Sequence, residues 1–446
     1  MKKIYVKGNA DWYLSLFKDF ENSLNGQSTS ELHAMRKLAV DRLHDTGFPT
    51  TGHEEWKYTN IETLLSHDFR LAAAHPQTTL GNLSGRGILP EDEKTPQLVF
   101  INGHFRADLS NVGKLAAGIE IMNLNKAIDI NHPVLARHFG KYASDDKESF
   151  VIMNTAFAQD GTLIRIADNT GLDQPVHLLY LTVPEQTASV SFPRNLIVTG
   201  RSSDLTFIET FAALEDGLYF TNAVTEVVIE ENTRVERVKI QIESEEAYHI
   251  SALHVHQQRN SRFIDYNVNL GARLSRNNIN TFFNGSGAET VLNGLYVGNH
   301  TQHMDNHTSI DHAMPNCESH ELYKGILDQK ARGVFNGKIF VRPDAQKTNA
   351  IQSNNCILLS DEATIDTKPQ LEIFADDVRC THGATVGQLD EDAFFYMRAR
   401  GIERTRARKM LIYAFASEVV DRIKEDELRD RVARLFAEKL ENVKLD

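Results

Sequence analysis

The stretch Ile279-Asn-Thr-Phe-Phe283, with Leu292-Asn-Gly-Leu-Tyr-Val297 shortly after it, decides the fold class. Both runs are short and rich in β-branched, aromatic and leucine residues, which is typical of strands. Runs of the same kind recur on both sides of this stretch, at residues 163–166, 178–183, 196–198, 224–229, 235–242, 338–341, 356–359, 371–374 and 384–386. Few helix signals interrupt them, so the chain is predicted to be mainly β.

Two packings could bury so many short strands. One is a pair of jelly-roll or sandwich units, and the other is a parallel β-helix that leaves polar residues at its corners. We favour the β-helix because the candidate corners are rich in Asn, Asp and Gly, although no repeat of fixed period is visible. The corners that we predict are Asn277-Asn278, Asn336-Gly337, Asn354-Asn355 and Asp376-Asp377.

Helical patterns flank the strand-rich part. Trp12, Leu16, Phe17 and Phe20 form one apolar stripe, and a second series of stripes begins after Asp390. At the first strands, residues 98–101 and 104–109 enclose Asn102-Gly103, which predicts a hairpin with a type I′ turn. The predicted organisation is an N-terminal helical region at 1–95, a β-helix core at 96–388 and a C-terminal helical region at 389–446.

Composition narrows the class of protein. The 446 residues include 48 Lys and Arg against 61 Asp and Glu, and the net charge of -13 disfavours a general nucleic-acid-binding protein. No apolar run approaches the ~18 residues of a membrane-spanning helix, and the first twenty residues lack the apolar core of a signal peptide. Three cysteines are typical of a reducing compartment. We therefore expect a cytoplasmic protein that binds neither nucleic acid nor membrane.

Histidines crowd one segment, where His300, His303, His307, His312 and His320 are possible metal ligands. We expect His303 and His307 to share a face only on a helix, whereas nearby Gly and Pro residues favour strands and turns. They are weak candidates, and no intrinsic metal is expected. A metal-dependent β-fold enzyme that uses the cluster from His300 to His312 stays an alternative, and it would hold zinc or iron tightly.

Cys380-Thr381-His382 is a second candidate site. Alternation along a strand would place the thiol and the imidazole on the same side, where they could share iron or persulfide sulfur. A nearby imidazolium would also lower the thiol pKa. The alternative is a buried small thiol beside a surface histidine.

Basic residues gather at the start of the C-terminal helices. Arg404 and Arg408 precede an apolar stripe of Leu411, Phe415 and Val419. A solvated charged face is the usual explanation of such a cluster. A basic helix with one apolar side is also a reasonable docking surface for another protein.

Several longer motifs resemble the SufB/SufD family, and in particular its SufD branch. They are Glu54-Glu-Trp-Lys-Tyr-Thr59, Ala345-Gln-Lys-Thr-Asn-Ala350, Asp366-Thr-Lys-Pro-Gln-Leu-Glu-Ile373, Cys380-Thr-His-Gly-Ala-Thr-Val-Gly387, Phe395-Tyr396 and Arg400-Gly-Ile402. Gly333-Val-Phe-Asn-Gly-Lys338 and the segment from His303 to Asp305 extend the resemblance, which spans most of the chain.

The resemblance implies a right-handed parallel β-helix flanked by helices, in a scaffold subunit of the SUF iron-sulfur cluster assembly machine. Such a subunit pairs with SufB and docks the SufC ATPase, so the chain itself is expected to be no enzyme and to hold no cofactor when isolated. By the family's motif, His382 and Cys380 would lie at the SufB interface, where a transient cluster forms, and the motif supports His382 more strongly than Cys380. The helices after Gly401, with Arg404, Arg408, Leu411, Phe415 and Val419, would contact SufC.

Two further points follow from the resemblance. The alternative within the family is a SufB-like chain that itself receives sulfur and builds the cluster, but the Cys-x-His-Gly-Ala-Thr form favours the SufD branch. The resemblance implies that ATP binding belongs to SufC. This agrees with Gly333-Val-Phe-Asn-Gly-Lys338, which is one residue too short for a phosphate loop.

The open ends of a β-helix carry unpaired backbone groups, so we expect the isolated chain to form a homodimer through its edge strands. Cys317 and Cys356 receive no predicted role, and the sequence does not indicate whether a flavin joins the complex.

Overall fold

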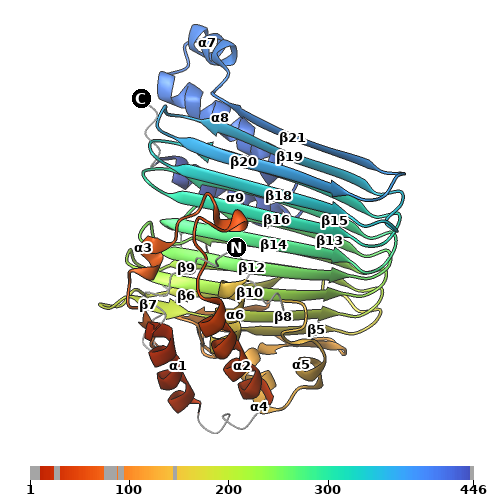
Figure 1. The fold of residues 1–446 in the computed structure, drawn as a ribbon. Coiled ribbons are helices and arrows are strands. Elements are labelled where there is room, and N and C mark those ends of the chain that lie inside the picture. The colour runs from red at the N-terminus through yellow and green to blue at the C-terminus, as the bar shows by residue number, and fades with distance from the viewer. Residues whose placement is uncertain (1–10, 25–30, 75–87, 89–94, 144–147, 442–446) are drawn as a thin grey trace.

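The computed structural model describes residues 11–24, 31–74, 88, 95–143 and 148–441. Its body is a parallel β-solenoid of about eight turns, whose strands alternate between two facing sheets (Figure 1). One sheet follows the order β20-β18-β16-β14-β12-β10-β8-β5-β4, and the other follows β21-β19-β17-β15-β13-β11-β9-β6-β2-β3. The predicted mainly β class and the β-helix are confirmed, and a pair of sandwiches is excluded.

The solenoid strands from β9 onward have 8 to 11 residues, whereas β5 to β8 are shorter. The full set is β5 (Thr162–Ile166), β6 (Val176–Thr182), β7 (Ser189–Ser191), β8 (Arg194–Thr199), β9 (Asp204–Ala213), β10 (Tyr219–Ile229), β11 (Arg234–Ile242), β12 (Tyr248–Gln257), β13 (Arg262–Asn269), β14 (Leu274–Phe283), β15 (Glu289–Gly298), β16 (His303–His312), β17 (Glu318–Leu327), β18 (Arg332–Val341), β19 (Asn349–Leu358), β20 (Thr364–Ile373) and β21 (Arg379–Gly387).

The step between successive coils varies. Tyr248 pairs with Leu274, Leu274 with His303 and Arg332 with Thr364, so the step changes from 26 to 29 to 32 residues along one sheet. The strands stay in register because the turns absorb the difference. This variation explains why the sequence shows no repeat of fixed period.

Most of the predicted corners are wrong. Asn277-Asn278, Asn336-Gly337 and Asn354-Asn355 lie inside β14, β18 and β19, and only Asp376-Asp377 lies in a turn. The observed corners use other asparagines, such as Asn232, Asn260 and Asn316, which have positive φ angles between 54° and 59°. Asparagine tolerates this left-handed backbone. The inward-facing asparagines serve a different purpose, because they belong to a polar interior.

The N-terminal end of the solenoid is closed by short strands: β1 (Arg70–Leu71), β2 (Gln97–Ile101), β3 (His104–Phe105) and β4 (Ile119–Asn123). Phe100 pairs with Phe105 in an antiparallel hairpin. Asn102 and Gly103 have φ angles of 52° and 80°, as a type I′ turn requires. The predicted hairpin is thus confirmed.

Helices cover the outer faces of both sheets. The helices are α1 (Asp11–Ser23), α2 (Glu31–Thr46), the 3₁₀ helix η2 (Glu54–Trp56), α3 (Glu62–Leu65), α4 (Leu124–Asp129), α5 (Pro133–His138), α6 (Ser149–Phe157), α7 (Glu391–Ala399), α8 (Arg404–Val420) and α9 (Asp426–Glu441). Residues of α1, α2 and α6 share one apolar cluster with β10 and β12, and those of α8 and α9 share another with β11, β13 and β15. Figure 1 shows α7 projecting from the C-terminal end. None of the described helices is long and apolar enough to cross a membrane.

Glycines make room for tyrosine rings inside the solenoid. A Cβ on Gly294 would collide with the ring of Tyr323 on the next coil. We predict that Gly294→Ala lowers the free energy of unfolding by about 1–3 kcal/mol, because the packed ring must shift. Urea unfolding measures this loss.

Gly387→Ala is the matched control, because a Cβ at this exposed position of β21 meets no atom within 4 Å. Its effect should stay within about 0.5 kcal/mol. Equal losses in the two variants would contradict the packing role of Gly294.

Candidate functional site

The C-terminal end of the solenoid is an open coil, formed by β20 and β21. Each is the last strand of its sheet, since β20 pairs with β18 and β21 with β19. Nearly every residue of β21 is exposed. The free edge of a strand offers N–H and C=O groups to another strand. The open coil is therefore suited to pairing with a second chain.

Cys380 and His382 lie on β21 in this open coil. Cys380 is in register with Ala350 of β19, and His382 with the buried Gln352. Side chains two positions apart on a strand share a face. The thiol and the imidazole therefore both belong to the inner face of the open coil, where the solenoid has no further strand above them.

The prediction that a nearby imidazolium lowers the thiol pKa of Cys380 is wrong. The thiol is half-buried and packs beside the apolar cluster of Ile339, Val341 and Ala350. This burial raises the pKa of the Cys380 thiol instead of lowering it. Among the hydrogen bonds of the described residues, none joins this thiol to the His382 imidazole.

The other two cysteines are buried. Cys317 lies just before β17, with its Sγ 3.4 Å from the carbonyl oxygen of Gly285. Cys356 lies inside β19, 3.0 Å from the hydroxyl of Tyr296, and burial raises its thiol pKa to about 11. Both thiols are held in their protonated form within the core.

The histidine cluster is split between two faces of the solenoid. Contrary to the expectation, His303 and His307 share a face on strand β16, because residues four apart also align on a strand. Both point outward, whereas His312 is buried inside and bonds to Ser319. No group of three metal-binding side chains forms within the described ranges.

Residues 53–59, which we call the strap, cross the outer face of four strands. Trp56 stacks on the guanidinium of Arg276 (β14) at 3.8 Å, and Thr59 donates a 2.6 Å hydrogen bond to Asp305 (β16). Glu55 accepts from Asn336 (β18), and Glu54 forms an ion pair with Lys368 of β20. The strap thus fastens the N-terminal region to the open coil. The role of this motif could not be predicted from the sequence, because its partners lie more than 200 residues away.

Asp305 is the centre of the contacts beneath the strap. Burial alone would raise its pKa, but His307 and Arg276 outweigh burial and hold the pKa of this carboxyl well below its usual range. The Nε2 of His303 donates a 2.8 Å hydrogen bond to the hydroxyl oxygen of Thr59, whose own hydrogen goes to Asp305, and burial lowers the pKa of His303 to about 4. Asp305 is therefore a buried anion that neutralises Arg276.

A cavity of about 480 Å³ lies beside the strap. Trp56 and Phe150 form an aromatic wall, and Asn278, Asn336 and Lys338 line the floor. Lys338 forms a 2.6 Å ion pair with Glu372 on a neighbouring strand. The loop-like segment that ends at Lys338 is therefore a solenoid strand whose lysine already has a carboxylate partner, and it does not form a phosphate loop.

The basic residues and the apolar residues of α8 make different contacts. Val419 is buried against the chain's own sheet, and Phe415 is half-buried beneath Lys324, whose Nζ lies 4.2 Å from its ring. Arg404 and Arg408 lie within 6 Å of the ring of Phe394 in α7. Leu411 is half-buried.

The exposed apolar residues of this region are therefore different from the predicted stripe. They are Phe395 and Tyr396 of α7 and Met410 and Tyr413 of α8, with Phe395 exposed to 75%. Such a group of exposed aromatic side chains is typical of a protein interface. We call it the α7–α8 surface.

We predict that Asp305→Asn lowers the free energy of unfolding by about 3–5 kcal/mol, because the substitution leaves the buried Arg276 without its counter-charge. Urea unfolding again measures the loss. Asp311→Asn is the control on the same strand, since its partner Arg342 is exposed and the pair should contribute only about 0–1 kcal/mol. Similar small losses in both variants would show that Asp305 does not anchor the strap contacts.

Comparisons with known proteins agree with this arrangement. Residues 181–415 match the family model of the SUF system FeS cluster assembly SufBD core domain, and residues 7–178 match the SufBD protein N-terminal region. An iron-sulfur cluster assembly SufBD family protein of Synechocystis is 34% identical over 92% of this chain and 91% of its own length.

Two further relatives are iron-sulfur cluster assembly proteins named SufD. The protein from Escherichia coli is 30% identical over 90% of this chain and 91% of its own length. The protein from Bacillus subtilis is 25% identical over 93% of this chain and 95% of its own length. The chain belongs to the SufBD family of the SUF iron-sulfur cluster assembly system.

Proposed function

We propose that this chain is a SufD-type scaffold, which pairs with SufB through the open coil and docks the SufC ATPase through the α7–α8 surface. The observation that carries the proposal is the open coil itself, which presents His382 and Cys380 beside a free strand edge. The relatives named SufD support this branch over a SufB-like role. The chain then acts in the cytoplasm without turnover of its own.

The iron-sulfur cluster is cargo in this proposal, formed where two chains meet. On this side of the interface, the exposed imidazole of His382 supplies a nitrogen donor. The raised thiol pKa of Cys380 makes the imidazole the better donor at neutral pH, because a thiol binds metal only after it loses its proton. His382 is therefore the residue that we assign first to the assembly site.

Docking of SufC would use side chains that this chain leaves exposed. Phe395, Tyr396, Met410 and Tyr413 supply apolar contact area, and Arg404 and Arg408 lie close to them around Phe394. Phe415 and Val419 would act indirectly, because they hold α8 against the sheet and so set its position. This division revises the predicted docking stripe.

The second candidate, a metal-dependent enzyme that uses His300 to His312, is less well supported. Its histidines point to opposite faces of β16, and His303 and His307 already bond to the strap and to Asp305. Metal analysis of the purified chain tests it, since that enzyme would retain zinc or iron.

The decisive experiment is anaerobic cluster reconstitution on a complex of this chain with SufB and SufC. We predict that His382→Ala leaves the three-chain complex intact on size exclusion but lowers its iron and sulfide content severalfold. His320→Ala is the control, because His320 is partly exposed on the outer face of β17. An unchanged cluster yield would remove His382 from the assembly site, and failure of the three chains to copurify would contradict the scaffold.

The isolated chain is predicted to form a homodimer through the open coil. Val386 is an exposed apolar residue of β21, and Val386→Asp would place a charge in the paired edge and shift the chain toward the monomer. Light scattering at micromolar concentration measures this shift. Ile130→Asp is the control, because Ile130 is similarly exposed but lies just after α4, near the closed end. A wild-type monomer would contradict the prediction.

A further inference from the structure

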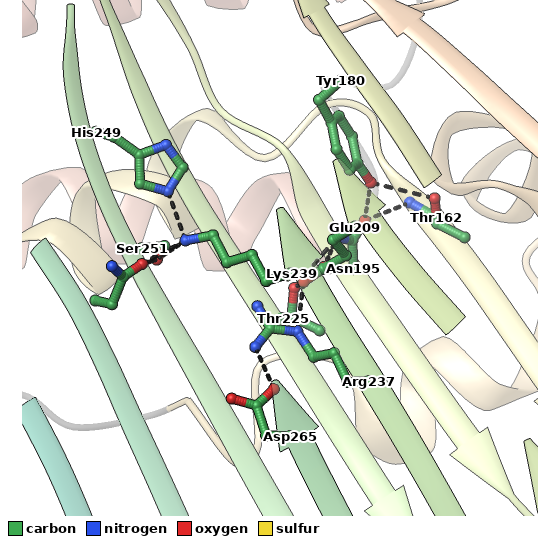
Figure 2. A network of polar contacts seen from close by, with 11 residues as sticks. Thr162, Tyr180, Asn195, Glu209, Thr225, Arg237, Lys239, His249, Ser251 and Asp265 are labelled. Carbon is green, nitrogen blue, oxygen red and sulfur yellow. Dashed lines mark hydrogen bonds and ion pairs between the residues drawn. The ribbon is translucent and has the colours of Figure 1, made fainter. Parts of the chain in front are cut away.

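Polar side chains of successive coils line one side of the solenoid interior, and we call this set the polar strip. Figure 2 shows its N-terminal half, where Tyr180 bonds to Asn195, Asn195 to Glu209, and Arg237 to both Glu209 and Asp265. The strip continues toward the open coil through inward-facing residues of the later strands. These are Asn267, Asn277, Asn306, Thr308, Glu321, Gln352, Asn354 and Thr367.

Many atoms of the polar strip are buried without a protein partner. They include Oδ2 of Asp265, Oδ1 of Asn267, Nδ2 of Asn306, Oε1 of Glu321 and Oε1 of Gln352. Buried polar atoms in native proteins are hydrogen-bonded to protein or to ordered water. Four of these atoms are acceptors and one, Nδ2 of Asn306, is a donor. Internal waters, which both donate and accept, would satisfy them together.

Glu321 is the last carboxyl of the polar strip before the open coil. Its Oε2 accepts hydrogen bonds from Gln352 at 2.6 Å and from Thr308 at 3.2 Å. Gln352 is in register with His382, so Glu321 lies two strands beneath the exposed imidazole, or about 10 Å away at the spacing of strands. Gln352 separates the two groups.

Within the described part of the chain, no cation is paired with Glu321. Its row on the sheet continues to Leu292 and then to Asp265, whose partner Arg237 also binds Glu209. The tyrosine hydroxyl of Tyr323 is the other titratable group that faces it, from the same strand. Burial raises the pKa of Glu321 to about 7. At neutral pH this carboxyl is therefore close to its midpoint.

We propose that Glu321 is a proton-exchanging carboxyl that internal waters of the polar strip connect to the open coil at His382. When Glu321 releases its proton, the O–H bond breaks and its electron pair stays on the carboxylate. The proton passes along hydrogen-bonded waters to solvent water at the open coil, where an oxygen lone pair forms the new O–H bond. The reverse transfer restores the acid.

We assign Glu321 the role of a proton store for chemistry at the open coil, and this role rests on the proposed assembly function. The exchange of protons between Glu321 and water does not rest on that function. The store also gives a reason for a buried carboxyl without a counter-ion, which a purely structural interior would replace by an apolar side chain.

Infrared spectroscopy of the isolated full chain tests the inference. The difference between wild type and Glu321→Gln should contain the C=O band of a protonated carboxylic acid about one unit below the pKa, and the band should vanish about one unit above it. After dilution into D₂O, the band should shift within minutes under native conditions, because water reaches the carboxyl without unfolding. Gln352→Leu should slow this shift at least severalfold, since it replaces the amide that lies in register between Glu321 and His382 with an apolar side chain.

Three outcomes would overturn the proposal. Absence of the band below neutral pH would mean that the carboxyl is ionised. A shift only on the timescale of global unfolding would mean that the strip is dry. An unchanged rate in Gln352→Leu, with the fold intact by circular dichroism, would mean that protons do not pass through the open coil. None of these results depends on SufB, SufC or iron, so they are independent of the reconstitution result.

Discussion

The in-register backbone ladder between successive parallel coils is the constraint on which the rest of the structure depends. Each residue of one coil is in register with a fixed partner of the next coil. An inward-facing side chain therefore stacks on the side chains at the same position of the neighbouring coils. This stacking places Gly294 beneath Tyr323 and Gln352 beneath His382. The ladder also has two ends, one at the first coil and one at the last. The N-terminal end is closed by a hairpin and helices, whereas the C-terminal end stops at two unpaired edges.

A ladder of this kind holds polar groups that an ordinary core would exclude. The hydrogen bonds of the coils fix the backbone independently of what fills the interior, and the polar strip runs beside an apolar cluster that includes Phe207, Phe263 and Phe335. Arg237, with its two carboxylates, costs desolvation that its ion pairs offset only in part. The interior is therefore divided lengthwise into an apolar half, which stabilises the solenoid, and a polar half, which leads to the open coil.

The sequence alone predicts the class of the fold well, because strand runs such as residues 279–283 depend on local side-chain preference. It predicts the corners poorly, since an asparagine inside a polar strip and an asparagine at a turn have the same local signature. Alternation along a strand correctly places Cys380 and His382 on one face. The pKa of the thiol could not be predicted, because it depends on Ile339 and Val341 of another coil. The contacts of the strap could not be predicted for the same reason. Nor could the pKa of Glu321, because three strands form its environment.

The ion pair between Glu54 and Lys368 has a consequence for the order in which the molecule is built. The two residues are 314 positions apart in the chain. At about 5–20 residues per second, the ribosome needs roughly 15–60 s to make the segment between them. Of the four strands that the strap covers, β14 is made first and β20 last, so Glu54 waits through the whole interval for its partner. The contact between Glu54 and Lys368 can form only after the final coil has emerged, so this last contact of the strap marks completion of the solenoid during synthesis.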